Sequence, residues 1–278
     1  MSAIKTINKI KSYGIKAKKK YGQNFIFDQN IFFKIFQKSK IIENINILEI
    51  GPGPGGLTQE ILKANVNQVY VVEKDKDLLP ILNDIRNLYP NKLNIIFEDA
   101  LNFDIKTLND FPFKIISNLP YNISTVLLIK WLTSDICNTS CKSLTLMFQK
   151  EVAERIIATT NTKNYGRLAV LSSWRMNSEK IIDVSPKSFR PIPKVKSTIL
   201  SINPKLEYFN FKNSKNLEHV TNVFFNQRRK MVKKPLSLLF KNINEISKKL
   251  GIDVNDRPQN LTPLKYIEIC KEYEKLFF

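Results

Sequence analysis

The chain has 278 residues, 43% of them hydrophobic, which suffices for a buried core in one large domain or in a large and a small one. Its 44 Lys and Arg outnumber 25 Asp and Glu, which gives a formal net charge of +19. Codon bias in an AT-rich genome would raise the number of lysines throughout a protein. So large an excess of basic over acidic residues is nevertheless typical of proteins that bind nucleic acids. One histidine and three cysteines without a C-x-x-C pair exclude a zinc site of recognisable spacing, so we expect no metal.

Two features of the sequence bear on where the protein acts. Three unpaired cysteine thiols, together with the lack of a signal peptide, indicate a cytoplasmic protein. No run approaches the ~20 apolar residues needed to cross a bilayer, so we expect no membrane partner.

Residues 1–15 at the beginning of the chain are rich in lysine but lack the pattern of a transit peptide, which predicts an arm that is flexible or contacts RNA. A helix is expected at about 29–39.

A glycine-rich turn follows the first apolar strand, in the sequence Ile47-Leu48-Glu49-Ile50-Gly51-Pro52-Gly53-Pro54-Gly55-Gly56. Glycines accept positive φ and let the backbone approach a ligand, and the helix that follows begins with unpaired N–H groups. These features predict a small-molecule site at the carboxyl end of the first strand of a parallel α/β sheet. The formal G-x-G-x-x-G match alone leaves open a dinucleotide, another ligand, or a plain turn among surface carboxylates.

Acids at three strand ends narrow the choice of ligand. Glu49 would repel a pyrophosphate but would receive the ammonium of an amino acid. Glu73 ends a strand about 20 residues after the glycines, where a carboxylate suits a ribose diol. Asp99 ends a strand expected at 93–99 and would accept from an adenine amine. Because no arginine accompanies these acids, S-adenosylmethionine is favoured over NADP.

The tetrapeptide Asn118-Leu119-Pro120-Tyr121 is the sharpest signal for chemistry. Strand and helix patterns alternate over 45–158, and the tetrapeptide ends the strand expected at 113–117, where open α/β sheets form their ligand crevices. The Asn118 oxygen and a neighbouring carbonyl can accept from an adenine NH₂, align it with a methyl sulfonium and favour a pyramidal nitrogen. Proline fixes the carbonyl, and Tyr121 offers a stacking face. The alternative is a plain Asn-Pro turn.

The second half of the chain changes character. Residues 168–174 are ambiguous between helix and strand, and strand-like runs at 180–184 and 197–202 flank a loop fixed by Pro186, Pro191 and Pro193. From about 217 to 278 only helical periodicity is present. We therefore expect a first domain at 1–204 and a small helical domain at 205–278.

Taken together, these stretches resemble the ribosomal RNA adenine N6,N6-dimethyltransferases, in particular the small-subunit group. The resemblance covers about residue 16 to the C-terminus. It rests on Tyr21-Gly22-Gln23-Asn24-Phe25-Ile26, the glycine turn, Glu73, Asp99, the Asn118 tetrapeptide, Ser188-Phe189-Arg190-Pro191-Ile192-Pro193-Lys194-Val195-Lys196-Ser197, Phe225-Asn226-Gln227-Arg228-Arg229-Lys230 and Arg257-Pro258-Gln259-Asn260-Leu261-Thr262.

The resemblance implies a Rossmann-like class I methyltransferase sheet with helices on both faces and a small C-terminal helical domain. It implies that N6 of two adjacent adenines, in a hairpin near the 3′ end of small-subunit rRNA, is dimethylated with S-adenosylmethionine. The substrate would be met in a pre-ribosomal small subunit by a monomeric enzyme. Ile26 departs from a commoner Leu in shape, not in polarity.

Site roles are likewise implied residue by residue. The cofactor would meet Asn24, Ile26, Gly51, Glu73, Asp99 and Asn118. The catalytic tetrapeptide comprises Asn118, Leu119, Pro120 and Tyr121, and Tyr121 would sandwich the flipped adenine with Phe189. Phosphates would be contacted by cations of the loop and of the tail, namely Arg190, Lys194, Lys196, Arg228, Arg229 and Lys230.

Three other functions compete with this interpretation. A methyltransferase acting on large-subunit rRNA for antibiotic resistance has neighbouring motifs, but the Phe-Arg-Pro-x-Pro-Lys-Val loop and the Arg-Pro-x-x-Leu tail favour the small-subunit group. An assembly factor with secondary catalysis is not excluded by an intact cofactor site. A nicotinamide dehydrogenase is disfavoured because no His or Lys near the site suits hydride transfer.

Overall fold

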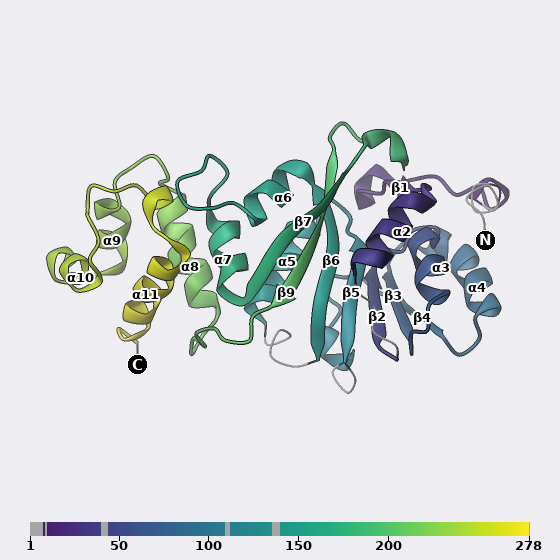
Figure 1. The fold of residues 1–278 in the computed structure, drawn as a ribbon, viewed down its shortest axis with the longest axis horizontal. Coiled ribbons are helices and arrows are strands. Elements are labelled where there is room, and N and C mark those ends of the chain that lie inside the picture. The colour runs from purple at the N-terminus through teal and green to yellow at the C-terminus, as the bar shows by residue number, and fades with distance from the viewer. Residues whose placement is uncertain (1–7, 9, 40–43, 109–111, 135–139, 278) are drawn as a thin grey trace. The chain divides into compact units, whose positions relative to one another are not determined.

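The computed structural model describes residues 8, 10–39, 44–108, 112–134 and 140–277 (Figure 1). The strands are β1 (Phe25–Ile26), β2 (Asn46–Ile50), β3 (Val69–Glu73), β4 (Leu93–Phe97), β5 (Phe113–Asn118), β6 (Cys141–Gln149), β7 (Met176–Val184), β8 (Phe189–Arg190) and β9 (Ser197–Pro204). The longer helices are α2 (Gln29–Lys38), α3 (Gly56–Leu62), α4 (Leu79–Leu88), α5 (Ser124–Thr133), α6 (Lys150–Ile156), α7 (Arg167–Arg175), α8 (Lys215–Phe225), α9 (Lys233–Leu239), α10 (Ile243–Leu250) and α11 (Pro263–Glu274).

The chain divides into two compact units. The first contains Met1–Leu128, Ile136–Ala153 and Glu179–Pro204, and the second contains Ile129–Asp135, Glu154–Ser178 and Lys205–Phe278. The second unit therefore includes two segments from the range 1–204. Periodicity along the chain could not reveal this, because a compact unit is defined by contacts between residues far apart in sequence. The functional division into 1–204 and 205–278 stays a prediction.

A seven-stranded sheet with the order β4-β3-β2-β5-β6-β9-β7 forms the centre of the first unit. Strands β2 to β6 pair in parallel, which confirms the expected α/β class, and β9 pairs antiparallel to β6. Figure 1 shows α2 on one face of the sheet and the start of α5 on the other. The antiparallel β9 was not anticipated, because an apolar pattern does not encode strand direction.

Local sequence explains the central elements. All five residues of β2 are buried, as expected for a strand covered on both faces of a parallel sheet. Helix α2 begins at the N-cap Asp28, whose side chain accepts a hydrogen bond from the Asn30 N–H, and it buries Ile31, Phe32 and Ile35. The helix expected at 29–39 is therefore confirmed, with its apolar stripe turned to the core.

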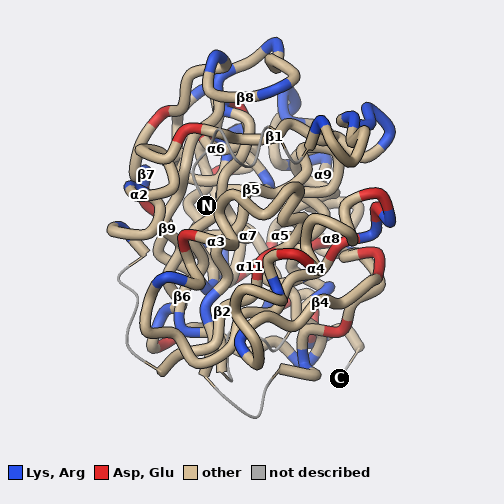
Figure 2. The backbone as a smooth tube through the Cα atoms, turned by 90° about the vertical axis from the view of Figure 1, so that its right-hand side faces the viewer, with Lys and Arg blue, Asp and Glu red and all other residues tan. Residues whose placement is uncertain are grey.

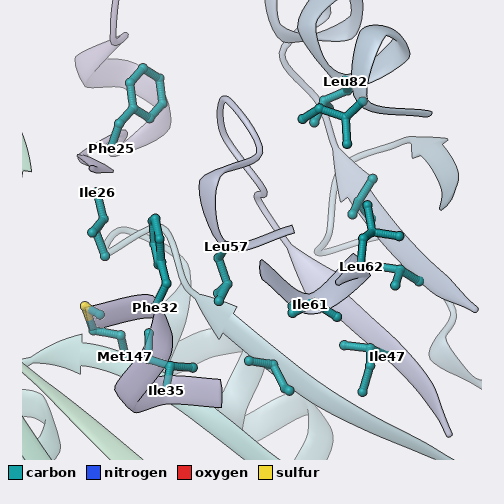
Figure 3. Close-up of a cluster of buried hydrophobic side chains, with 14 of the residues drawn as sticks. Phe25, Ile26, Phe32, Ile35, Ile47, Leu57, Ile61, Leu62, Leu82 and Met147 are labelled. Atoms are coloured by element: carbon teal, nitrogen blue, oxygen red, sulfur yellow. The ribbon is translucent and has the colours of Figure 1, made fainter. Parts of the chain in front are cut away.

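The hydrophobic core beside the sheet joins segments that are far apart in the sequence (Figure 3). Side chains from β1, α2, α3, α4, β2 and β6 meet there. The labelled members in Figure 3 are Phe25, Ile26, Phe32, Ile35, Ile47, Leu57, Ile61, Leu62, Leu82 and Met147. This packing fixes the short strand β1 against the body of the first unit, which matters for the site below.

The ambiguous and irregular regions take definite forms. Residues 168–174 lie in the helix α7, and the proline-containing loop forms a short 3-10 turn at Pro186–Ser188 before β8. Strand β8 pairs antiparallel with β1. Beyond Pro204 the described residues form helices and no strand, as expected, and α8 packs on α11 through Phe224 and Tyr266, whose ring centroids lie 5.3 Å apart.

Candidate active site

A cleft at the carboxyl ends of the central strands brings most of the predicted site residues together. Within the first unit it is lined by Asn24, Ile26, Gly51, Glu73, Asp99, Asn118, Leu119, Pro120 and Tyr121, among others. These residues come from the N-terminal loop and from the ends of β2, β3, β4 and β5. Parallel strands place their carboxyl ends at one edge of a sheet, which is why residues so distant in sequence meet.

The glycine turn and the Asn118 tetrapeptide touch one another. Gly51 has φ of +64°, and a Cβ at this position would lie 3.1 Å from Pro120 Cγ. Glycine is favoured here because L side chains rarely adopt this φ, and an added Cβ would also press on the Pro120 ring. Beneath this contact the Ser117 hydroxyl donates a 2.6 Å hydrogen bond to the Ile50 carbonyl, which ties the end of β5 to the end of β2. This hydrogen bond therefore links two of the strand ends that lead into cleft residues.

Two carboxyl groups of the cleft are almost removed from water. Glu49 is 2% exposed, and burial raises its pKa to about 8, against the opposing effect of a 2.6 Å hydrogen bond from Thr58 Oγ1. Glu73 is 6% exposed, and burial raises its pKa to about 7, although its Oε1 accepts from the N–H groups of Lys74 and Asp75. Each group favours a ligand that brings a positive charge or hydrogen-bond donors.

Asp99 is held as a charged acceptor at the next strand end. The Leu101 N–H donates to Asp99 Oδ1 and Lys74 Nζ donates to Oδ2, each at 3.0 Å. These interactions keep the pKa of Asp99 below its usual range. The strand β4 ends at Phe97, so Asp99 lies just beyond it, two residues after the strand end. Its carboxylate remains suited to accept from an amine.

Asn118 lines the cleft and has a buried side-chain acceptor without a donor. Its Nδ2 donates a 3.3 Å hydrogen bond to the Asn24 carbonyl. Its Oδ1 is buried and accepts no hydrogen bond from any residue that the structure describes. A buried acceptor without a donor is costly unless a ligand supplies one. The site therefore fits a ligand with an N–H group directed at Asn118 Oδ1.

The two predicted aromatic faces have different environments. Tyr121 is half-buried and lines the cleft, and its hydroxyl lies 2.6 Å from Ser197 Oγ. Phe189 is fully buried, pairs with Ile26 across β1 and β8, and belongs to the hydrophobic core. Phe189 therefore does not line the cleft, and its role as the second face beside Tyr121 stays a prediction. Stacking on Phe189 would require the ring to leave the core.

The sequence interpretation missed how the N-terminal loop that lines the cleft is anchored. Lys18 Nζ lies 2.6 Å from both Asp75 Oδ1 and Asp77 Oδ2, and Gln23 Nε2 donates to Asp75 Oδ2 at 2.9 Å. Although burial opposes it, these donors hold the pKa of Asp75 below its usual range. An acid two residues after Glu73 was the available signal. Tyr21 and Gln23, which also line the cleft, are positioned by this anchor.

The arm before Lys18 also makes contacts where it is described. Ile15 is buried in the hydrophobic core, and the Tyr13 hydroxyl donates to Asp84 Oδ2 at 2.9 Å. Residues 1–7 and 9 lie outside the described residues. The part of the predicted arm from about Ile10 therefore packs on the first unit.

The predicted RNA-contacting cations lie in two irregular segments. In the first unit, Arg190, Lys194 and Lys196 are exposed around β8, a segment rich in Lys and Arg in Figure 2. In the second unit, Arg228, Arg229 and Lys230 lie in the turn after α8 rather than on a helix face. Arg228 donates to the Lys163 carbonyl, while Arg229 and Lys230 are exposed.

The cysteines and acids of the described residues do not form a metal centre. No group of three or more His, Cys, Asp and Glu is arranged to hold a metal ion within the described ranges. Cys141 and Cys270 are buried free thiols, and Cys137 lies outside the described residues.

None of the described helices combines the length and the apolar character needed to cross a membrane.

The sheet order, the glycine turn and the acids at successive strand ends define a Rossmann-like S-adenosylmethionine-dependent methyltransferase. Residues 14–275 match the family described as ribosomal RNA adenine dimethylase. The chain is 48% identical over 262 residues to the ribosomal RNA small subunit methyltransferase A of Pelagibacter ubique (strain HTCC1062), covering 94% of this chain and 98% of that protein. The chain belongs to the ribosomal RNA adenine dimethylase family.

Solved structures agree with this assignment. A dimethyladenosine transferase from Plasmodium falciparum is similar with a TM-score of 0.76 and 25% identity, over 89% of this chain and 96% of that one. The 23S rRNA methyltransferase ErmE is similar with a TM-score of 0.67 and 21% identity, over 90% of this chain and 100% of that one. The second likeness concerns the fold alone.

Proposed function

We propose that the protein transfers methyl groups from S-adenosylmethionine to N6 of two adjacent adenines in a hairpin near the 3′ end of small-subunit (16S) rRNA. The products are N6,N6-dimethyladenosines, and the modification belongs to small-subunit maturation. Family membership and the 48% identical relative named for small-subunit rRNA support the substrate. The observation that carries the chemistry is the buried, unused Oδ1 of Asn118 in the cleft.

The cofactor would be held by the acids of the cleft. Glu73 would accept from the ribose hydroxyls, Asp99 from the cofactor adenine, and Glu49 lies where an ammonium group would be neutralised. Asn24, Ile26 and Gly51 also line the cleft and would contact the cofactor. When bound, the sulfonium provides an activated methyl group, so the protein has mainly to align the acceptor.

Alignment of the acceptor amine falls to the Asn118 tetrapeptide. Asn118 Oδ1 would accept one N6–H, and a backbone carbonyl would accept the other. The Pro120 carbonyl already accepts from the N–H groups of Ile123 and Ser124, at 3.1 and 3.0 Å, so we assign this second role to Leu119. Two acceptors on one NH₂ group favour its pyramidal form, in which the nitrogen lone pair is available for attack.

The target base would stack on Tyr121, the aromatic residue of the tetrapeptide that lines the cleft. Phe189 would serve as a second face only after leaving the core, so the proposal depends on Tyr121. The RNA backbone would be contacted by the exposed cations around β8 and after α8. A monomer acting in the cytoplasm on a pre-ribosomal small subunit is part of the same proposal and rests on the family resemblance.

Two alternatives remain distinct from this proposal. A large-subunit rRNA methyltransferase shares the fold, but the similarity to ErmE is only 21% in sequence. An assembly factor with secondary catalysis would use the same RNA surfaces and would need no alignment of an amine. The unused Asn118 acceptor favours catalysis over a purely assembling role.

The test is primer extension on rRNA from cells with and without the gene, because dimethyladenine blocks reverse transcription. We expect two adjacent stops near the 3′ end of small-subunit rRNA that disappear without the gene. Stops that disappear from large-subunit rRNA instead would favour the resistance enzyme. Cells carrying only the Asn118→Ala variant separate catalysis from assembly, since an assembly factor would still restore subunit maturation without the stops.

A further inference from the structure

We propose that Ser197 is a positioning residue for methyl transfer, which fixes the Tyr121 side chain through the hydrogen bond between their hydroxyls. This inference rests on the proposed function, in which the target adenine stacks on Tyr121. Ser197 does not line the cleft, so it acts through Tyr121 rather than on the substrate. The two residues are far apart in the sequence and meet only in the folded first unit.

The geometry gives Ser197 little freedom. Its Oγ lies 2.6 Å from the Tyr121 hydroxyl oxygen, a short distance for two neutral hydroxyls. Ser197 is 0% exposed and is the first residue of β9, where it pairs with Gln149 of β6. Strand β6 pairs in turn with β5, whose last residue is Asn118. The Ser197 hydroxyl is therefore placed by the same sheet that places the catalytic asparagine.

A tyrosine at a cleft wall needs such a restraint. Its ring can swing about χ1 between staggered positions, and stacking on a base demands one of them. A partner for the hydroxyl at the far end of the ring restricts this swing and leaves the ring faces free. The bond therefore orders the stacking surface before the base arrives, which lowers the entropic cost of alignment.

The same bond connects the ring to the proposed RNA-contacting loop. At one end of that loop, β8 pairs with β1, whose Ile26 lines the cleft. At its other end is Ser197, held to Tyr121. The exposed Arg190, Lys194 and Lys196 lie between these two attachments. RNA seated on the loop would thus be in a fixed position relative to the stacking ring.

A double-mutant cycle tests the inference with the full chain and isolated small subunits as substrate. The proteins are the parent, Ser197→Ala, Tyr121→Phe and the double variant, and the readouts are the single-turnover rate and the affinities for RNA and for S-adenosylmethionine. We expect each single change to lower the rate about 3- to 10-fold, the effect of one neutral hydrogen bond. The double variant should be no slower than either single variant.

Tyr121→Phe removes the same bond without touching buried Ser197, so it keeps the test informative if Ser197→Ala folds poorly. Ser201→Ala is the matched control on β9, since the Ser201 hydroxyl accepts from Asn203 of its own strand, and we expect the parental rate. Rates that fall independently in the two single variants, or a Ser197→Ala variant as fast as the parent, would overturn the inference. A parent that transfers no methyl group to small subunits would overturn the proposed function itself.

Discussion

The acidic residues of the site differ in how deeply the fold buries their carboxyl groups, and their pKa values differ accordingly. Glu49 and Glu73 are buried carboxyl groups with raised pKa values, whereas Asp99 is a half-buried carboxylate with a lowered pKa. All three acids lie at or near strand ends, but their environments differ. Each environment suits a different part of one cationic ligand with an adenine and a ribose.

Glu73→Ala should weaken S-adenosylmethionine binding, while RNA binding by the free protein changes little. A ribose diol donates two hydrogen bonds to one carboxylate, and each such charged bond contributes about 1.5–3 kcal/mol. We therefore expect at least a ~10-fold decrease in affinity by calorimetry. Glu60→Ala, which removes a partly exposed acid of α3 that pairs with Lys63 and does not line the cleft, is the control. Equal affinity in the Glu73 variant and the parent would refute this role.

The stability of the ligand-free protein should fall as pH rises through neutrality. The pKa of Glu49 is raised from 4.5 to about 8, so the folded state holds its proton more tightly than the unfolded state. Its stabilising effect is present below pH 4.5 and is lost by about pH 8, with a slope of up to about 1.4 kcal/mol per pH unit. Denaturant titrations between about pH 5.5 and about pH 8 measure this slope. In Glu49→Gln it should be clearly shallower, and an unchanged slope would contradict the burial argument.

Asn118→Ala should lower the methyl-transfer rate on the order of 100-fold while RNA affinity stays near the parental value. An interaction that matters mainly in the transition state reduces kcat, and one shared with the ground state raises KM. Asn118→Asp keeps an acceptor but adds a charge, so we expect activity between those of Ala and the parent. The measurement is single-turnover transfer to isolated small subunits. A parental rate constant with only KM raised would show that Asn118 merely positions the ligand.

At the scale of elements, the site depends on two irregular segments that the sheet holds in place. The loop before β1 lines the cleft and is anchored by Lys18 to Asp75 and Asp77. Strand β1 then joins β8, so the cofactor side and the proposed RNA side share one small two-stranded sheet. A movement of the loop before β1 would therefore also displace the loop around β8, and the reverse.

Lys18→Met should reduce S-adenosylmethionine affinity about 2- to 5-fold, with little change in the denaturation midpoint. The pair is partly exposed and so contributes modestly to stability, but its removal frees the loop that carries Asn24 and Ile26. Calorimetric titration measures the effect. Lys19→Met, an exposed neighbour, should bind as the parent does, and a similar decrease in both variants would point to general charge rather than to the anchor.

At the scale of the whole molecule, charge is the dominant property. A net charge of +19 gives the chain a general attraction for RNA that depends on salt. The cations are not equivalent, since Arg228 is engaged with a backbone carbonyl whereas Arg229 and Lys230 are exposed. Specific interactions with phosphates must therefore be separated from this general background.

Alanine at Arg228, Arg229 and Lys230 together should reduce the slope of log affinity against log salt by roughly 0.7–0.9 for each phosphate that the variant no longer neutralises. The Arg229→Ala, Lys230→Ala double variant spares the Arg228 hydrogen bond and should show most of the effect. Lys241→Ala with Lys248→Ala removes equal charge from exposed positions of the same unit. An identical slope in this control and in the double variant would mean that the turn after α8 is only a solvated surface.

The class of fold and most of the residues that line the cleft follow from local patterns in the sequence. Apolar runs, glycines and acids at strand ends are local patterns, and parallel pairing collects strand ends at one edge, so Gly51, Glu73, Asp99 and Asn118 were predictable together. The resemblance added the family, which the matches to known proteins confirmed. The helix at 29–39 and the helical C-terminal part were likewise visible in their periodicity.

The remaining features could not be predicted from the sequence, because each depends on contacts between segments that are distant along the chain. The inward turn of Phe189 follows from the pairing of β8 with β1, and the Lys18 anchor follows from the position of Asp75 after β3. The direction of β9 and the inclusion of 129–135 and 154–178 in the second unit have the same origin. Burial of Glu49 also belongs here, since a pKa of about 8 reflects surroundings that no run of neighbouring residues encodes.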